Sequence, residues 1–314
     1  LYTADPSAHV FNGKIYIYPS HDEDIDVENN DNGDQYDMKD YHVYEMPDTE
    51  TYPRDCGCVL KLEDIPWASK QLWAPDCVEK DGKYYFVFPA RDKEGFFRIG
   101  IATSDKPEGP FKAEPNYIPG SYSIDPCMFP DTDGKYYLTF GGIWGGQLDQ
   151  YRNNKWSADN KEPQGDEEAC TAKIALMKDN LLEMAEEPKD IMILDENGKP
   201  LTGGDEARRY FEDPWLFKKG DTYYFTYSTG TTHLLCYATS KNVYGPYTYG
   251  GVILTPVLGW TTHHSILEFN GKWYLFYHDC ERSGGVNQKR NIKFREMKFK
   301  EDGGIETMDG SIEK

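Results

Sequence analysis

Residues 82–88 read Gly-Lys-Tyr-Tyr-Phe-Val-Phe, and residues 134–140 read Gly-Lys-Tyr-Tyr-Leu-Thr-Phe. In both segments a glycine that suits a tight turn precedes alternating aromatic and aliphatic residues, which is the pattern of a β-hairpin with its return strand. The same pattern occurs at residues 13–18, 220–227 and 271–277. The sequence therefore contains five copies of one hairpin.

A second repeat extends these hairpins. Residues 102–104 and 238–240 both read Ala-Thr-Ser, and each is followed by a Gly-Pro pair that starts five residues later. These segments predict a third strand that ends in a turn before an outer strand, and residues 173–177 and 293–299 predict weaker third strands. Five such units, with helix expected only over residues 180–187, predict an all-β, five-bladed β-propeller with four-stranded blades.

Domain organisation follows from the same repeat. The chain has 314 residues and contains no Gly/Ser-rich or Pro-rich linker. We therefore expect residues 1–314 to form a single domain, even though a chain of this length often has two. The acidic stretch at residues 22–40 is predicted to be a long loop within the first blade.

Composition limits the class of partner. The chain has 34 Lys and Arg against 54 Asp and Glu, a net charge of −20. Such a protein repels phosphate backbones and anionic lipid surfaces, so we expect no nucleic-acid partner and no membrane partner. Aromatic residues make up 15% of the chain, and they supply flat platforms for the apolar faces of ligands.

The cysteines predict no disulfide framework. Seven cysteines are an odd number, they are scattered, and no Cys-x-x-Cys pair occurs. Free thiols are therefore predicted, which favours a cytoplasmic or periplasmic location over secretion without fixing the compartment.

Polar residues precede four of the five turn glycines at nearly equal distances. Asp5, Asp125, Glu212 and His263 lie 8, 9, 8 and 8 residues before their glycines. The innermost strands of a propeller start at one mouth of the channel, so these side chains are expected to converge. Asp-Pro is a common turn initiator. Carboxylates crowded into one cleft raise each other's pKa, however, and this favours a functional site.

Three converging carboxylates beside aromatic residues suit the cleavage of a glycosidic bond. That reaction needs an acid to protonate the leaving oxygen and a base or nucleophile on the other side of the sugar ring. A third carboxylate can keep the acid protonated by electrostatic repulsion.

The motifs around these residues resemble those of glycoside hydrolase family 43. They are Ala-Asp-Pro-Ser at 4–7, Trp-Ala-Pro-Asp at 73–76, Ser-Ile-Asp-Pro at 123–126, Glu-Asp-Pro at 212–214 and His-His-Ser at 263–265. The resemblance covers essentially the whole chain, in order. It implies a five-bladed propeller that cleaves β-xylosidic or α-L-arabinofuranosidic bonds with inversion.

The resemblance also implies roles for the three carboxylates. Asp5 would be the general base that activates water, and Glu212 would be the general acid. Asp125 would be the third carboxylate, which raises the pKa of Glu212 and orients it. An inverting pair is expected to lie roughly 6.5–9.5 Å apart to admit the water.

Further site residues follow from the same resemblance. Trp73 is expected to pack on the sugar, and Arg290 to contact sugar hydroxyls and a catalytic carboxylate. His263 is expected to hold a central Ca²⁺ or another divalent cation, and no organic cofactor is implied. Asp213 stands where the family usually has a small residue, which places an extra carboxylate near the acid.

Substrate enclosure is expected to come from two loops of the propeller. Residues 22–40 and the glycine-rich segment at 141–147, which carries Trp144, are the predicted walls. Walls of this size favour an exo-acting pocket, with a β-xylosidase on xylo-oligosaccharides as the first expectation. An α-L-arabinofuranosidase on arabino-oligosaccharides is the second.

Three alternatives remain at this stage. An endo-arabinanase would have a more open groove. A sucrose-cleaving, retaining propeller is disfavoured because Ala4 and Ser7 depart from its Asn-Asp-Pro-Asn-Gly motif. A sugar-binding propeller without catalysis would not need three carboxylates at matched positions. The sequence predicts no oligomeric state.

Overall fold

Tight turns with residues at positive φ close the innermost hairpins. In the first hairpin, Asn12 and Gly13 have φ of 51° and 75°. The corresponding turns at residues 81–82 and 270–271 repeat this pair of positive angles. Two-residue turns of this type match the twist of antiparallel strands, which is why the sequence places glycine there.

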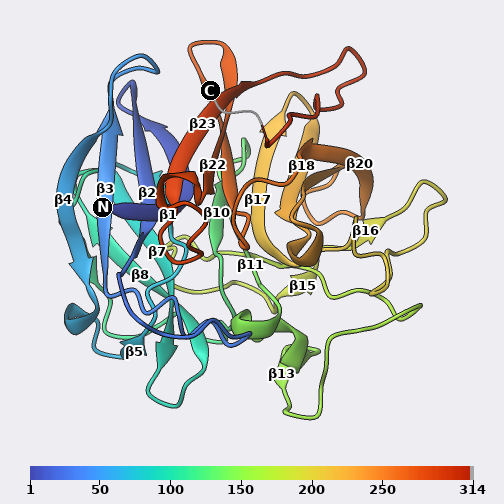
Figure 1. Ribbon diagram of the computed structural model, residues 1–314, viewed down its shortest axis with the longest axis horizontal. Coiled ribbons are helices and arrows are strands. Elements are labelled where there is room, and N and C mark those ends of the chain that lie inside the picture. Colours follow the sequence, from blue (N-terminus) through green and yellow to red (C-terminus); the bar gives the residue numbers. More distant parts are fainter. Residues whose placement is uncertain (312–314) are drawn as a thin grey trace.

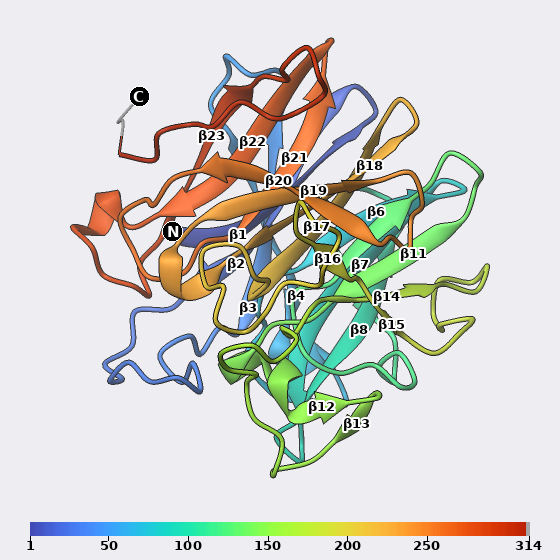
Figure 2. The same cartoon turned by 90° about the vertical axis from the view of Figure 1, so that its right-hand side faces the viewer.

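The computed structural model describes residues 1–311, in which five twisted sheets are arranged around a central axis (Figures 1 and 2). The first sheet contains β1 (Tyr2–Phe11), β2 (Lys14–Asp22), β3 (Asp40–Met46) and β4 (Arg54–Lys61). The second contains β5 (Ala68–Lys70), β6 (Asp76–Lys80), β7 (Lys83–Asp92), β8 (Phe97–Ser104) and β9 (Lys112–Ala113). The third contains β10 (Cys127–Pro130), β11 (Tyr136–Phe140), β14 (Lys173–Leu176) and β15 (Lys189–Asp190).

The fourth sheet contains β17 (Glu212–Lys219), β18 (Thr222–Ser228), β19 (Leu235–Ser240) and β20 (Tyr247–Leu254), with β16 (Ile193–Leu194) added parallel at its outer edge. The fifth contains β21 (His264–Phe269), β22 (Lys272–Asp279) and β23 (Asn291–Met297). A small hairpin, β12 (Tyr151–Arg152) with β13 (Lys155–Trp156), stands apart from the blades. The helices among residues 1–311 are five 3₁₀ turns of three residues each: Leu62–Asp64, Trp144–Gly146, Leu148–Gln150, Gly230–Thr232 and Glu281–Ser283.

This arrangement confirms the five-bladed β-propeller. The blades vary in strand number, because the second and fourth sheets each have five strands and the fifth has three within residues 1–311. The helix expected over residues 180–187 is wrong. That segment makes turns, with Lys178 N–H donating to Glu183 O at 2.8 Å, and then leads into β15.

Aromatic and aliphatic side chains fill the space between blades. Tyr18 of the first blade and Phe86 of the second are fully buried against each other, with ring centroids 5.9 Å apart. Ile15 packs in one cluster with Phe276 of the fifth blade. Figure 1 shows the first blade, in blue, beside the last strands of the chain, in red. The ring therefore closes where the first blade packs against the fifth.

Residues 23–39 form a loop between β2 and β3, as predicted for the acidic stretch. We call this segment the 23–39 loop. The second blade holds it in place, because Gln71 Nε2 donates to Gly33 O at 3.0 Å and Arg91 Nη2 donates to Asn32 Oδ1 at 2.9 Å. The loop is thus attached to a blade that it does not belong to.

The remaining features of the fold concern the cysteines and the helices. All seven cysteines are free thiols in the structure, as the sequence predicts. Within residues 1–311, no helix is long and apolar enough to cross a membrane.

Candidate active site

The starts of the innermost strands converge as the sequence predicts. Asp5 lies in β1, Glu212 begins β17, and Asp125 and His263 lie just before β10 and β21. All four line one cavity of about 180 Å³, which we call the central cavity. Residues more than 250 positions apart in the chain therefore share one site.

The backbone at these positions is unusual. Asp5, Asp125 and Asp213 have φ of 51°, 56° and 64°, and each precedes a proline. The register of the first hairpin shifts between Ala4 and Ser7, which marks a β-bulge. Bulges redirect side chains, and strained non-glycine residues are concentrated at functional sites. At Asp5 and Asp125 this backbone places the carboxylates at the central cavity.

Asp5 is held ionised by a cluster of donors. Ser20 Oγ donates to Asp5 Oδ2 at 2.5 Å, and Arg290 Nη1 donates to Asp5 Oδ1 at 3.1 Å. Burial alone would raise the pKa of Asp5, but Arg290, His263 and His278 together lower that pKa to about 2. A carboxylate that stays charged at neutral pH can accept a proton from water.

Arg290 is itself fixed by a residue that the sequence analysis missed. Its Nε and Nη2 donate to the two oxygens of Asp22 at 2.9 and 2.7 Å, a bidentate pair. With Nη1 donating to Asp5 and to Thr261 Oγ1, four of the five guanidinium N–H donors are used. The expected contact of Arg290 with Asp5 is present, and the contact with sugar hydroxyls stays a prediction. The only sequence signal for Asp22 was its place at the start of the acidic stretch.

Glu212 has the opposite electrostatic environment. Burial and then the negative charge of Asp5 raise the pKa of Glu212 to about 8, although Arg290 opposes them. No hydrogen bond to the Glu212 carboxyl is present among residues 1–311. Asp125 also has a raised pKa, because of burial and then Glu212, but its Oδ2 accepts a hydrogen bond from Asp213 N–H at 3.0 Å. That bond favours the charged form of Asp125 and so opposes the rise in its pKa.

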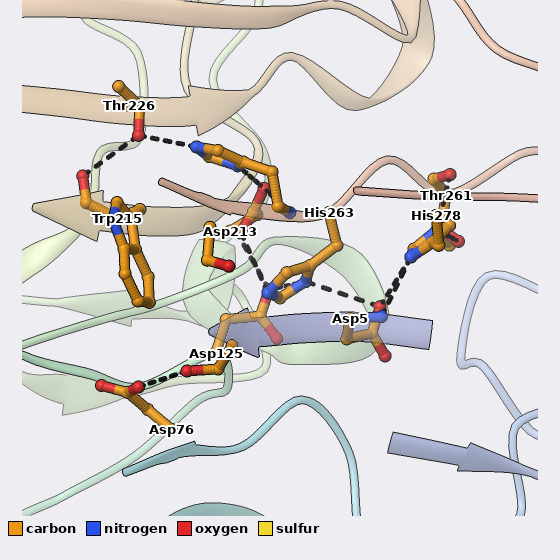
Figure 3. A network of polar contacts seen from close by, with 12 residues as sticks. Asp5, Asp76, Asp125, Asp213, Trp215, Thr226, Thr261, His263 and His278 are labelled. Atoms are coloured by element: carbon orange, nitrogen blue, oxygen red, sulfur yellow. Dashed lines mark hydrogen bonds and ion pairs between the residues drawn. The ribbon is translucent and has the colours of Figure 1, made fainter. Parts of the chain in front are cut away.

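The extra carboxylate expected near the acid is Asp213, and it contacts two histidines, one of which is His263 (Figure 3). One oxygen contacts His263 Nε2 at 2.9 Å. The other accepts the His264 N–H at 2.9 Å and also contacts His264 Nδ1. Thr226 Oγ1 completes the chain at 2.6 Å from His264 Nε2. The sequence predicted the extra carboxylate of Asp213 but not its contacts with His263 and His264.

His263 has a donor set that fits a cation. Its Nδ1 lies 3.6 Å from Asp5 Oδ1 and 3.9 Å from Asp125 Oδ2. Burial lowers the pKa of His263 to about 4, so the imidazole is neutral at physiological pH. With Nε2 bonded to Asp213, the Nδ1 lone pair faces two carboxylates, an arrangement that a positive ion between them would stabilise.

Aromatic residues line the walls of the central cavity. Trp73 and Trp144 both border it, as predicted, together with Tyr36 of the 23–39 loop. Trp73 Nε1 donates to Tyr36 O at 2.8 Å, and Trp144 Nε1 donates to Glu162 Oε2 at 2.8 Å. Both predicted loops therefore form walls of the site. Trp260 also borders the cavity, and the sequence analysis missed it because it lies outside the repeated motifs.

This geometry defines a class of protein. It is a five-bladed propeller whose central cavity has aromatic walls and contains both an ionised carboxyl group, Asp5, and a protonated one, Glu212. Comparison with known proteins agrees. The family model for glycosyl hydrolases family 43 matches residues 1–305. A xylosidase/arabinosidase from Bacteroides ovatus is 57% identical over 313 residues, which cover 99% of this chain and 96% of that protein. A β-xylosidase from Xylanibacter ruminicola is 52% identical, with 98% and 97% covered.

A solved structure is equally similar. A β-xylosidase/α-arabinofuranosidase from a compost microbial metagenome, crystallised with xylotriose in a calcium-free form, has a TM-score of 0.98 and 56% identity. The comparison covers 100% of this chain and 96% of the other. The chain belongs to glycosyl hydrolase family 43 and is a glycoside hydrolase.

Proposed function

We propose that this chain is an exo-acting, inverting glycoside hydrolase that releases xylose from β-xylosides and xylo-oligosaccharides, with α-L-arabinofuranosidase activity as a second reaction. The observation that carries the proposal is the pair of opposite environments in one small cavity, Asp5 with a pKa of about 2 and Glu212 with a pKa of about 8. An acid and a base must coexist at one pH for glycoside hydrolysis.

Each carboxyl group has one task in this reaction. Asp5 accepts a proton from water as the water oxygen bonds to the anomeric carbon. Glu212 donates its proton to the glycosidic oxygen as the bond from that oxygen to the anomeric carbon breaks. Asp125, in its ionised form, favours the protonated form of Glu212 before the reaction. The products are a free sugar of inverted configuration and the shortened alcohol.

The size of the cavity supports exo action. Its volume of about 180 Å³ lies below the roughly 300–1,000 Å³ of sites for drug-sized ligands. The 23–39 loop, Trp144, Trp260 and Asn287 all line it. A terminal sugar fits such a cavity better than the middle of a chain. The names of the relatives, xylosidase/arabinosidase and β-xylosidase, support xylose as the main product.

We also propose that His263 Nδ1, together with Asp5 and Asp125, would hold a divalent cation such as Ca²⁺. When bound, the cation would supply positive charge that keeps the two aspartates ionised. Asp213 would orient His263 through Nε2, as carboxylates commonly orient metal-binding histidines. The structure of the compost relative is of a calcium-free form, which supports testing this chain for Ca²⁺ binding.

The test uses p-nitrophenyl β-D-xylopyranoside, p-nitrophenyl α-L-arabinofuranoside and xylotriose. We expect turnover of both aryl glycosides with the xyloside preferred, and α-xylose as the first product seen by NMR from xylotriose. β-Xylose as the first product would overturn inversion, and cleavage of linear arabinan alone would overturn the exo-xylosidase proposal.

The cation has its own test with a readout besides activity. EDTA should lower the melting temperature of the wild type, and Ca²⁺ should restore it. In His263→Asn neither addition should move the melting temperature by as much. An equal response of wild type and variant would place the ion elsewhere.

A further inference from the structure

A second group of potential metal ligands lies in the first blade, apart from the central cavity. His21 is in β2, and Asp40 and His42 are in β3. Asp40 and His42 are two residues apart on one strand, so they point to the same face of the sheet. One ligand atom from each of the three residues lies within 4.8 Å of the others. None of the three lines the central cavity.

The contacts within this group are close and ordered. His21 Nδ1 lies 2.6 Å from Asp40 Oδ1. The rings of His21 and His42 meet edge to face with centroids 5.3 Å apart. Asp55 of β4 approaches His42 Nδ1 with both oxygens, at 3.0 and 3.2 Å. The Asp55 contact leaves His42 Nε2 available as a ligand, and carboxylates often hold metal-binding histidines in this way.

The group is open to ions from solvent. The side chains of His21 and His42 are each 15% exposed, and that of Asp40 is 26% exposed. An ion can therefore enter without disturbing the buried core on the other face of the blade. Two imidazoles and one carboxylate are ligands typical of Zn²⁺ and neighbouring transition metals, whereas Ca²⁺ and Mg²⁺ prefer sites in which oxygen ligands predominate.

The position of the group connects it to the wall of the active site. His21 lies next to the last residue of β2, and Asp40 is the first residue of β3. These two residues therefore bracket the 23–39 loop. That loop contributes Gly33 and Tyr36 to the central cavity. Anything that fixes His21 to Asp40 also fixes both ends of this wall.

We propose that His21, Asp40 and His42 form a binding site for Zn²⁺ or a similar transition-metal ion, and that the bound ion clamps the base of the 23–39 loop. The site is separate from the cation site proposed at His263, and it does not depend on the proposed sugar specificity. The bound ion affects the stability and closure of the cavity wall. It does not act on the reaction directly, because none of its three protein ligands contacts the reacting carboxyl groups.

The first experiment is calorimetric titration of ZnCl₂ into the full chain saturated with Ca²⁺. We expect one equivalent to bind, and affinity to fall at least tenfold in Asp40→Asn and in His42→Gln. Asp55→Asn should weaken binding by about 10–100-fold, the usual effect of losing a carboxylate that orients a ligand. Asp37→Asn is the matched control, since it removes one charge nearby and should leave Zn²⁺ affinity unchanged.

The second experiment follows the loop. Zn²⁺ should slow proteolytic cleavage within residues 23–39 in the wild type and in Asp37→Asn, but not in Asp40→Asn. His263→Ala should keep the Zn²⁺ site. Should a variant fail to fold, Co²⁺ added to the Ca²⁺-saturated wild type should give the visible ligand-field bands of a nitrogen-containing site.

Three results would overturn the proposal. They are no Zn²⁺ binding by the Ca²⁺-saturated wild type, equal binding by Asp40→Asn and Asp37→Asn, and loss of the bound ion in His263→Ala. Binding without protection of the loop would overturn the clamp.

Discussion

The innermost strands of the propeller have residues with positive φ at both ends, and the two ends differ in burial and in chemistry. At the turn end, Asn12 and Asn270 both have φ of 51° and are exposed. At the cavity end, Asp5, Asp125 and Asp213 have φ between 51° and 64°, are at most 5% exposed, and precede prolines. The same backbone conformation thus occurs in two very different settings.

The turn end of each strand serves folding, and the cavity end serves the active site. Asparagine visits the left-handed region readily, so the turn end adopts it at little cost and sets the hairpin register. A residue before proline is disfavoured in helical regions, and a strained residue of this kind costs on the order of 1–3 kcal/mol. The buried hydrogen bonds of the cavity end offset that strain. The turn end can therefore be changed without loss of chemistry, and the cavity end cannot.

The largest effect is expected at the cavity end from Glu212→Gln. The amide cannot donate a proton of comparable acidity, so kcat on p-nitrophenyl β-D-xylopyranoside should fall by about 10²–10⁴-fold. The melting temperature should stay close to that of the wild type. Glu268→Gln makes the same change at an exposed position on β21 and should keep full activity. Activity of Glu212→Gln within tenfold of the wild type would remove Glu212 as the acid.

The pH profile tests the same residue without mutation. Glu212 must be protonated to act as the acid, and burial with the charge of Asp5 raises its pKa to about 8. Activity should therefore persist through neutral pH and be lost as pH rises through about 8. Asp5 must be ionised, and its pKa of about 2 keeps it so over the whole practical range. A basic limb of kcat/KM at the ordinary pKa of a glutamate, about 4.3, would contradict this assignment.

A smaller effect is expected from Asp213→Asn, which keeps the strained backbone conformation but replaces the carboxyl group by an amide. Asparagine tolerates the φ of 64° but cannot serve both histidines as a carboxylate does. Because Asp213 is only 1% exposed, loss of its buried hydrogen bonds should lower the free energy of unfolding by about 1–3 kcal/mol. Urea unfolding measures this. No change in stability would mean that the contacts to His263 and His264 contribute little.

The same contrast explains what the sequence could predict. The hairpins were predictable because a turn and its strand are local, as at residues 82–88. The nearly equal spacing from Asp5 and Asp125 to their turn glycines predicted the convergence. The pairing of Asp22 with Arg290 was not predictable, since it joins residues 268 positions apart. Short elements such as β16 were missed because two residues carry no periodic pattern. The expected helix at 180–187 failed because packing beside β14 and β15 overrides local propensity.

Two glycines of nearly equal φ, Gly33 in the cavity wall and Gly13 in the first hairpin turn, allow the two settings to be compared by the same substitution. Gly33, at φ 73°, lies against Trp73, and a Cβ there would come within 2.5 Å of the ring. Gly33→Ala should raise KM for the aryl xyloside and destabilise the fold by more than the turn variant, because it must displace a wall of the cavity.

The turn variant, Gly13→Ala, should have the smallest effect. Gly13 has φ of 75° and open space around its Cβ position, so alanine adds only the cost of the left-handed backbone, about 1–2 kcal/mol. Urea unfolding should show that loss, and kcat and KM should match the wild type. A change in KM from Gly13→Ala would contradict the comparison, because it would mean that the turn end is coupled to the site across the length of β1. Equal stability losses in the two glycine variants would instead show that Trp73 can move at no cost, and that the 23–39 loop is a softer wall than its contacts indicate.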